Sequence, residues 1–333
     1  MAAPPPGLRC RPVAWSEDFF VVSGFLITTL LLKEEAATGR IDLGRFYLRR
    51  AFRLLPVLFL FLTTIALLTI AGFMVVPVQD FVRCLTFTRN YGSTAWADAH
   101  LWSLSVEAQF YALWAVAFAW LGARGRVMAA VALLLAVPFY RMATFDGAGE
   151  MRIFDFGYNA DSLMFGCLAA MLLWWYRPRL QAVSTPLLLG WQIGCTGLVY
   201  AVWFVQRLPV HKEMVDSIGL TLQMGAVAAL VVSAVAVRRG PLYRLLNGSI
   251  LQRIGLISYG LYVWQQIFVC LPGTYLDRIP LFTVFPVNLF AAGLMAWLSY
   301  RLVERPFLLI GACFRAAPLR QSQRAVSAPP QKT

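Results

Sequence analysis

Long apolar stretches recur along almost the whole of this 333-residue chain. A helix needs about 20 predominantly apolar residues to cross a hydrocarbon core about 30 Å thick. The stretches predict nine membrane-spanning helices: Phe19–Leu32, Leu54–Val76, Leu104–Leu121, Val127–Tyr140, Leu163–Tyr176, Leu187–Val205, Ile218–Val237, Ile254–Leu271 and Leu281–Val303. The first, fourth and fifth are short, so we expect them to extend into their polar flanks or to be partly re-entrant.

Composition supports an all-α, polytopic membrane bundle. Hydrophobic residues make up 59% of the chain and charged residues 14%, whereas soluble domains average about half and about a quarter. The net charge of +13 could suggest a nucleic-acid partner, but the basic residues concentrate in loops between apolar segments, as the positive-inside bias expects. We therefore expect a lipid bilayer, and no nucleic acid, as the partner.

Loop charges predict the orientation in the membrane. If the loop Lys33–Arg53 is cytoplasmic, the loops on that side and the C-terminal tail carry nineteen Lys and Arg residues, against seven in the opposite loops. This asymmetry predicts a cytoplasmic C-terminus and an N-terminus outside. The first residues, Met1 to Trp15, contain no apolar region typical of a signal peptide.

The six cysteines show no metal-binding or disulfide pattern. They stand at positions 10, 84, 167, 195, 270 and 313, and none forms a Cys-x-x-Cys pair. Most lie within or beside apolar segments, where cysteine acts as a small core residue. The sequence therefore predicts no bound metal and no disulfide framework.

A charged residue lies inside the third apolar stretch, in the run from His100 to Tyr111. A carboxylate at membrane depth costs several kcal/mol on insertion scales, so it normally faces a polar cavity. Glu107 has Ser103 four residues before it and Tyr111 four residues after it, which places all three on one helical face. This pattern predicts chemistry or transport inside the membrane.

The loop before the second stretch ends in the basic run Phe46–Pro56. Arg50 and Arg53 share a helical face, and two guanidinium groups there could hold the phosphates of a donor such as a coenzyme A thioester. Anchoring to lipid headgroups is the alternative, which composition alone favours.

Several motifs resemble the acyltransferase-3 family, bacterial multi-pass enzymes that O-acylate sugars. They follow one another in the family's order over about residues 17 to 310. The matching segments are Phe19–Thr28, Phe46–Pro56, His100–Tyr111, Ile257–Trp264 and Tyr300–Phe307. The resemblance implies an irregular segment at residues 1–16, an acyltransferase-3-like membrane domain at 17–310 and a disordered cytoplasmic tail at 311–333.

The resemblance also implies roles for particular residues. Arg50 and Arg53, with Arg49 beside them, match the donor-side arginines that meet acyl-CoA in the cytoplasm. Glu107, with Trp102, Ser103 and Tyr111 around it, matches an outward-facing site for the carbohydrate acceptor. Acyl-CoA, with acetyl as the expected acyl group, is then a co-substrate, and no bound cofactor is implied.

The chain departs from the family pattern at its start. Relatives begin with a span that carries an Arg and, eleven positions later, a His taken as catalytic base or acyl relay. Met1–Asp18 contains no such match, so the resemblance predicts a ten-span fold that lacks its first span and transfers acyl groups slowly. His100 and His211 are the only histidines. His100 lies seven residues before Glu107 and could replace the missing base, although a helix-start position at the outer rim is the favoured interpretation.

Two further positions carry alternative interpretations. Asp161 stands where the family usually has Arg-x-Asp, with Asn159 in the arginine position. It could contact the acceptor, but an N-cap of the Leu163 span explains it equally well. Near the C-terminus, Pro306 is expected to end the last helix after Glu304.

The sequence as a whole predicts a membrane O-acyltransferase of the bacterial inner membrane that acts on an envelope polysaccharide or related glycan. Two alternatives remain open at this point. One is a truncated and catalytically inactive relative, and the other is a transporter of a small polar molecule that uses Glu107 as an ion-coupling carboxylate.

Overall fold

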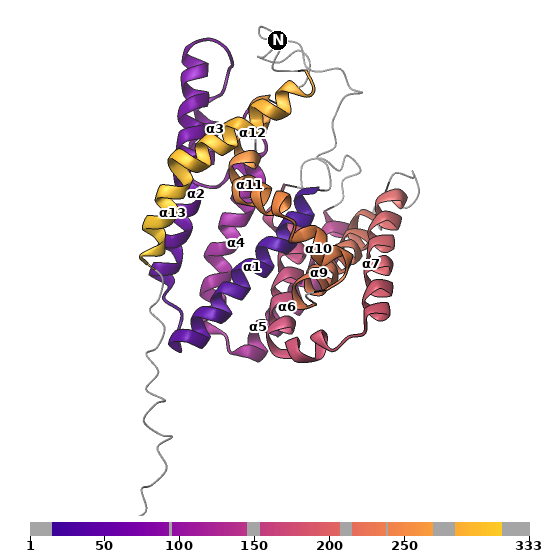
Figure 1. The fold of residues 1–333 in the computed structure, drawn as a ribbon. Helices are drawn as coiled ribbons and strands as arrows, with labels where there is room; N and C mark the ends of the chain where they lie inside the picture. The colour runs from indigo at the N-terminus through magenta and orange to yellow at the C-terminus, as the bar shows by residue number, and fades with distance from the viewer. Residues whose placement is uncertain are drawn as a thin grey trace, which may run out of the picture.

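The computed structural model describes residues 15–92, 95–144, 154–206, 215–237, 239–268 and 284–314, and this part consists of helices and connecting loops (Figure 1). The helices in chain order are α1 (Trp15–Thr38), α2 (Leu43–Ile70), α3 (Val78–Leu85), η1 (Arg89–Tyr91), α4 (Leu101–Trp120), α5 (Ala123–Ala143), α6 (Phe156–Gln181), α7 (Thr185–Val205), η2 (Val215–Gly219), α9 (Leu220–Ala236), α10 (Pro241–Leu246), α11 (Ser249–Phe268), α12 (Val287–Ser299), η5 (Tyr300–Glu304) and α13 (Arg305–Ala312). Most of the predicted N-terminal segment and tail, and His211, lie outside the described residues.

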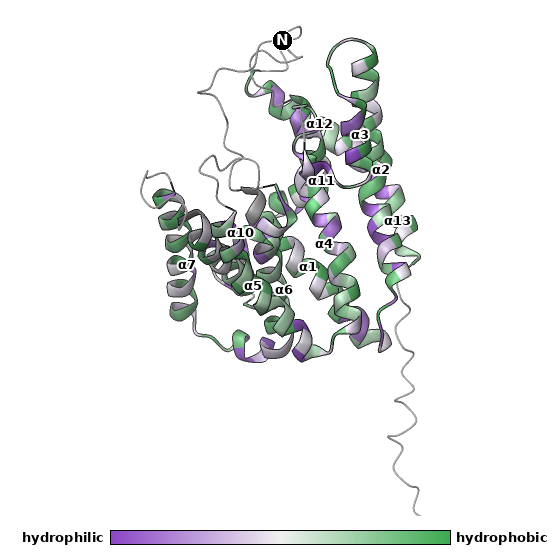
Figure 2. Cartoon of the chain, turned by 180° about the vertical axis from the view of Figure 1, so that it is seen from behind, coloured by the Kyte–Doolittle hydropathy of each residue, from purple (hydrophilic) through white to green (hydrophobic). Residues whose placement is uncertain are grey.

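A helix covers most of the described residues of each predicted apolar stretch, although α2 ends at Ile70, six residues before the predicted end at Val76, and α12 begins only at Val287. The three short stretches do extend into their flanks, as α1, α5 and α6 have 24, 21 and 26 residues. Five described helices are long and apolar enough to cross a membrane: α2, α5, α6, α7 and the segment Ser217–Ala236 that contains α9. Figure 2 shows the green of hydrophobic residues along most of these helices. The count of nine spans stays a prediction.

The crossing of α1 and α6 holds the centre of the bundle together. A Cβ atom on Gly24 would lie 2.0 Å from the Leu163 carbonyl oxygen, and one on Gly166 would lie 2.0 Å from the Val21 carbonyl oxygen. Only glycine fits at both points, as is common where membrane helices approach closely. The crossing fixes the position of Ser23, which precedes Gly24 and is buried.

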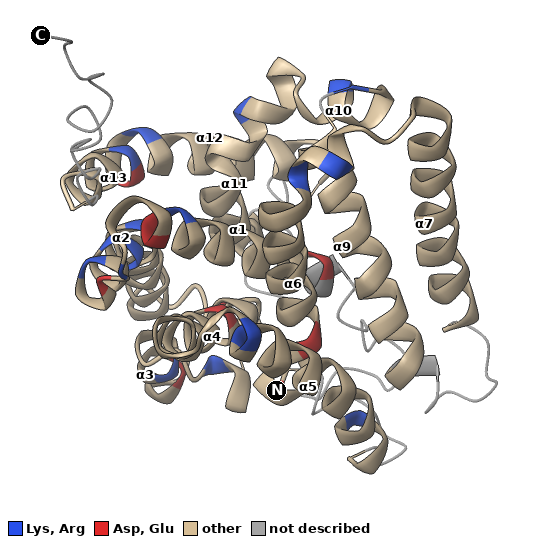
Figure 3. Ribbon diagram, turned by 90° about the horizontal axis from the view of Figure 1, so that it is seen from below, with Lys and Arg blue, Asp and Glu red and all other residues tan. Residues whose placement is uncertain are grey.

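Ion pairs join several helices at one end of the bundle. Glu34 near the end of α1 pairs with Arg49 of α2, which also donates to the Phe314 carbonyl oxygen at 3.0 Å. Glu35 receives two hydrogen bonds of 2.7 Å from Arg126 at the start of α5. The predicted cytoplasmic loop and Phe314, just after α13, therefore lie at the same end, the lower one in Figure 1. Charged segments are sparse along the helices elsewhere, which are mostly tan in Figure 3.

The structure corrects the prediction that Pro306 ends the last helix. The chain passes from the π-helical turn η5 directly into α13, and Pro306 lies in the first turn of α13. Proline inside an α-helix removes a backbone hydrogen bond and clashes with the carbonyl four residues earlier. A π-helical turn widens the helix at that point, so the helix continues to Ala312. Glu304, the last residue of the turn, is buried.

Candidate active site

Glu107 is buried in the second turn of α4 and accepts two hydrogen bonds. One comes from the Tyr111 hydroxyl on the same helix, and the other from the Ser23 hydroxyl of α1. The sequence predicted Tyr111 and Ser103 on the face of Glu107. Tyr111 does bind Glu107, whereas Ser103 hydrogen-bonds the Tyr262 hydroxyl at 2.8 Å. Glu107 is thus held by hydroxyl groups, and in the described part of the chain no ion pair neutralises it.

Ser23 is a site residue that the sequence reasoning did not select. It lies within the motif Phe19–Thr28, 84 residues before Glu107 in the chain. The available signal was a serine inside an otherwise apolar stretch, next to Gly24. Five residues further along α1, Thr28 accepts a hydrogen bond of 2.9 Å from the Trp114 indole, which adds a second link between α1 and α4.

Arg50 lies next to this carboxylate site. Its guanidinium carbon lies 5.5 Å from the centre of the Tyr111 ring and 5.8 Å from that of Phe46. Among the described residues, no hydrogen bond or ion pair occupies Arg50, and Glu107 attracts it electrostatically. The predicted donor-side arginine and the predicted acceptor-side carboxylate therefore share one neighbour, Tyr111.

The other two predicted arginines differ from each other. Arg53 lies almost one turn after Arg50 and is exposed, and it interacts electrostatically with the buried Glu304. Arg49 is occupied by Glu34 and by the Phe314 carbonyl oxygen. Arg50 and Arg53 are therefore the arginines with donor atoms available to an incoming anion, whereas Arg49 holds α1, α2 and the end of α13 together.

Glu304 is a second residue that the sequence reasoning passed over. Its Oε2 atom is buried and has no hydrogen-bond partner among the described residues. Tyr259 of α11, which also interacts electrostatically with Glu304, donates a hydrogen bond of 2.7 Å to the Leu54 carbonyl oxygen of α2. The available signal was a carboxylate one residue before an Arg-Pro pair, a pattern that is equally typical of a helix end.

His100 immediately precedes α4 and contacts α11 rather than Glu107. Its Nε2 atom lies 3.1 Å from the Val263 carbonyl oxygen, so Nε2 carries the proton and Nδ1 is the acceptor. Burial lowers the pKa of His100 to about 3, which keeps the ring neutral. The ring packs edge-on against Phe61 and Tyr262, and Nδ1 has no partner in the described part of the chain.

Trp102 lies between the carboxylate site and the start of α6. Its ring is half-buried and packs edge-on against Phe20 of α1 at 5.9 Å and against Phe154 at 4.9 Å. Trp102 thus presents a partly exposed aromatic surface five residues before Glu107, toward the start of α4. Such a surface suits the apolar face of a sugar ring.

Asp161 is fully buried inside α6, six residues after Asp155, the N-cap of that helix. The N-cap interpretation of Asp161 is therefore wrong. Its carboxylate accepts hydrogen bonds of 2.6 Å from Arg141 of α5, 2.6 Å from Thr221 of α9 and 2.9 Å from the Ser162 backbone. Asn159 stands in the arginine position of the family pattern, and the arginine that binds Asp161 is Arg141 of a different helix, α5.

No three His, Cys, Asp or Glu side chains within the described ranges come together as a metal site needs. The chemistry available at the site is that of a carboxylate, hydroxyl groups, an imidazole and two arginines. These groups suit transfer between an anionic donor and a neutral hydroxyl compound.

An all-α membrane bundle with this buried polar centre agrees with what comparison with known proteins finds. Residues 17–303 match the family described as an acyltransferase domain, the acyltransferase-3 family. The chain belongs to this family, and the resemblance drawn from the motifs is confirmed.

The chain is similar to O-acetyltransferase OatA of Staphylococcus aureus strain MRSA252, with 27% identity over 93% of this chain and 55% of that protein. It is also 27% identical to "Putative peptidoglycan O-acetyltransferase YrhL" of Bacillus subtilis strain 168, over 86% of this chain and 49% of that protein. The chain thus spans about half the length of these relatives. No solved structure matches it.

Proposed function

We propose that this chain is an integral membrane O-acyltransferase that moves an acyl group, in the first instance acetyl, from acyl-CoA to a hydroxyl of an envelope polysaccharide or related glycan. The observation that carries the proposal is the contact chain Arg50–Tyr111–Glu107–Ser23, which joins an unpaired arginine to a buried carboxylate. Family membership and the names of the similar O-acetyltransferases support the reaction class.

The donor binds at Arg50 and Arg53 in this proposal. Coenzyme A carries phosphate groups, and a guanidinium binds phosphate through paired, charge-assisted hydrogen bonds. Both arginines lie on α2 near the end of the bundle where Glu34 and Glu35 bind Arg49 and Arg126. We place this end in the cytoplasm of a bacterial inner membrane, because the predicted basic loops gather there.

The acceptor hydroxyl approaches Glu107 from the side of Trp102 and Ser103. Its oxygen attacks the thioester carbonyl carbon, the carbon–sulfur bond breaks, and coenzyme A leaves as the thiolate. The hydroxyl proton passes to the Glu107 carboxylate, which acts as general base. Ser23 and Tyr111 hold this carboxylate in place from two helices through the same oxygen, Oε1, so that Oε2 remains for the acceptor.

The test measures acyl-CoA binding and acetyl transfer by the purified full chain with Arg50→Ala and Arg53→Ala. Each substitution removes a charge-assisted contact worth about 1.5–3 kcal/mol, so we expect affinity to fall roughly ten- to a hundredfold. Arg45→Ala is the matched control, since Arg45 lies on the same helix with a surface partner, Asp42, at 3.2 Å. Such pairs contribute about 0–1 kcal/mol.

Two results would count against the proposal. Unchanged affinity in both variants would make these arginines lipid anchors. Uptake of a solute into proteoliposomes without consumption of acyl-CoA would favour a transporter.

A further inference from the structure

Helix α3, which follows α2 and lies outside the candidate site, has three distinct sides. At 100° per residue, Asp80, Phe81 and Cys84 occupy one side, and Asp80 and Cys84 are buried against the rest of the protein. The remaining two sides are available to the surroundings. The helix thus packs on the protein mainly with one side, and on another side Arg83 also donates a hydrogen bond of 3.3 Å to the Gly92 carbonyl oxygen.

Buried polar contacts fix the rotation of α3 about its axis. Asp80 pairs with Arg83 at 3.1 Å and lies 3.8 Å from Arg89, and Arg89 donates two hydrogen bonds of 2.8 Å to Asp98. The Cys84 thiol donates to the same Asp98 carboxylate at 3.3 Å. Turning the helix would break this group of contacts and leave buried charges without partners, which is costly.

An apolar stripe covers the second side. Val78, Val82 and Leu85 fall within about 60° of one another on the helix, and they are 78%, 53% and 44% exposed. The third side is polar, because Gln79, Arg83 and the C-cap residue Thr86 follow on the next part of the circumference. This arrangement of protein, apolar and polar sides is what a helix at a membrane–water interface needs.

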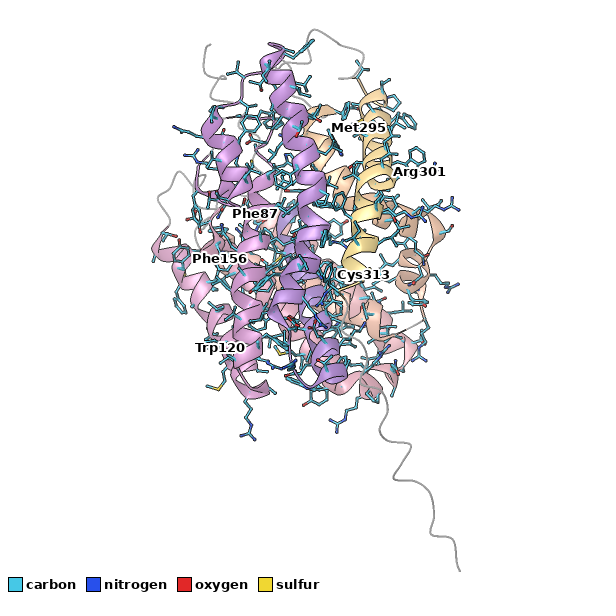
Figure 4. All side chains as sticks on the ribbon, turned by 90° about the vertical axis from the view of Figure 1, so that its left-hand side faces the viewer. Phe87, Trp120, Phe156, Met295, Arg301 and Cys313 are labelled. Atoms are coloured by element: carbon cyan, nitrogen blue, oxygen red, sulfur yellow. The ribbon has the colours of Figure 1, made fainter. Side chains whose placement is uncertain are left out.

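The stripe continues an apolar surface that begins on α2, one of the helices long enough to span a membrane. Leu67 and Ile70 near the end of α2, and then Phe73 and Val75, are exposed. The 28 residues of α2 extend about 42 Å, more than the hydrocarbon core of about 30 Å. α3 lies beside the upper part of α2 (Figures 1 and 4). In Figure 4 the label of Phe87, two residues past the end of α3, helps to locate this helix.

We propose that α3 is an interfacial helix whose apolar side, formed by Val78, Val82 and Leu85, binds phospholipid in the leaflet on the acceptor side. Its polar side faces water, and the side that carries Asp80 and Cys84 is bound to the protein. The same contacts that fix α3 end at Asp98, two residues before His100 and four before Trp102. Lipid binding by α3 would therefore hold the acceptor side of the candidate site at the level of the headgroups.

The experiment places a photoreactive benzophenone amino acid at one position of the full chain in nanodiscs of phosphatidylethanolamine and phosphatidylglycerol. Position 82 tests the apolar side, and position 79 is the matched control, since Gln79 is exposed on the polar side of the same helix. Mass spectrometry after irradiation identifies the adduct. We expect phospholipid adducts at position 82 to exceed those at position 79 by at least about fivefold, since only the apolar side of an interfacial helix enters the acyl region.

Position 78 repeats the test on the apolar side and covers the case in which the Val82 variant does not fold. Equal lipid adduct yields at 79 and 82 would overturn the proposal. So would adducts at 78 and 82 that have the mass of a second copy of the chain, because the stripe would then be a protein interface. The proposal does not depend on the transfer reaction, so unchanged acyl-CoA affinity in the Arg50 and Arg53 variants would leave it standing.

Discussion

Glu107 of α4 and Asp161 of α6 are two buried carboxylates, and their surroundings differ. Asp161 receives an ion pair from Arg141, a hydroxyl hydrogen bond from Thr221 and a backbone hydrogen bond from Ser162. Glu107 receives hydroxyl hydrogen bonds from Ser23 and Tyr111. Asp161 forms a direct ion pair, whereas Glu107 forms none among the described residues and only feels the charges of Arg50 and Arg53 at longer range.

This difference separates a structural role from a chemical one. A buried charge that is paired and hydrogen-bonded contributes a fixed connection between helices, and removing one partner costs several kcal/mol. A carboxylate held by neutral hydroxyl groups can still take a proton or bind a substrate hydroxyl. The sequence placed both residues among the site candidates, and the structure gives them different expected effects on stability and rate.

The largest effect should follow from Glu107→Gln. The amide keeps the size of the side chain and can still accept hydrogen bonds from Ser23 and Tyr111, but it cannot take a proton. We expect the acetyl-transfer rate to fall by about 10²–10⁴, the usual contribution of general-base catalysis. Acyl-CoA binding should be retained, which a calorimetric titration of the same variant checks. A variant that transfers at the full rate would remove Glu107 from the reaction.

The matching experiment on the other carboxylate is Arg141→Ala. This change leaves Asp161 buried without its ion-pair partner, and we expect unfolding in mixed micelles to become easier by about 3–5 kcal/mol. Arg45→Ala is again the control, because its pair with Asp42 lies at the surface. A loss of activity in Arg141→Ala without any loss of stability would contradict the comparison, since Asp161 would then act in the reaction.

Removing one hydroxyl donor from each carboxylate tests the difference between Glu107 and Asp161 further. Tyr111→Phe removes one of the two donors to Glu107, and we expect a two- to tenfold slower transfer, since a hydrogen bond contributes about 0.5–1.5 kcal/mol. Thr221→Val removes a donor to Asp161 without changing the side-chain shape. It should lower stability by about 1–3 kcal/mol and leave the transfer rate of the folded protein unchanged. If both variants alter the same property, the two carboxylates do not have separate roles.

Local patterns in the sequence predicted the helices and part of the site. The spacing of four residues between Glu107 and Tyr111 correctly indicated that they meet on one helical face. Contacts between distant segments could not be obtained in this way. Ser23 reaches Glu107 across 84 residues, and Arg141 belongs to a different helix from Asp161. Such pairs depend on how whole helices cross.

Local patterns also failed to predict where the last helix ends. Proline after Glu304 usually marks a helix boundary, and no sequence pattern here indicates the π-helical turn from Tyr300 to Glu304 that accommodates it. The error also hid Glu304, whose buried carboxylate lies near Arg53 only because the helix continues and packs along α2. For Arg49, the ion pair with Glu34 depends on the turn between α1 and α2.

The smallest effect is expected at His100, whose neutral ring contacts α11 instead of either carboxylate. His100→Gln can keep a nitrogen donor near the Val263 carbonyl oxygen while it removes the ring acceptor Nδ1. If Glu107 is the base, the transfer rate should remain within about fivefold of the unsubstituted chain, because general-base catalysis, worth about 10²–10⁴, is untouched. The measurement is the transfer rate as a function of pH for both chains. A fall of two orders of magnitude with a changed pH profile would instead make His100 the base, with Glu107 binding the acceptor beside it.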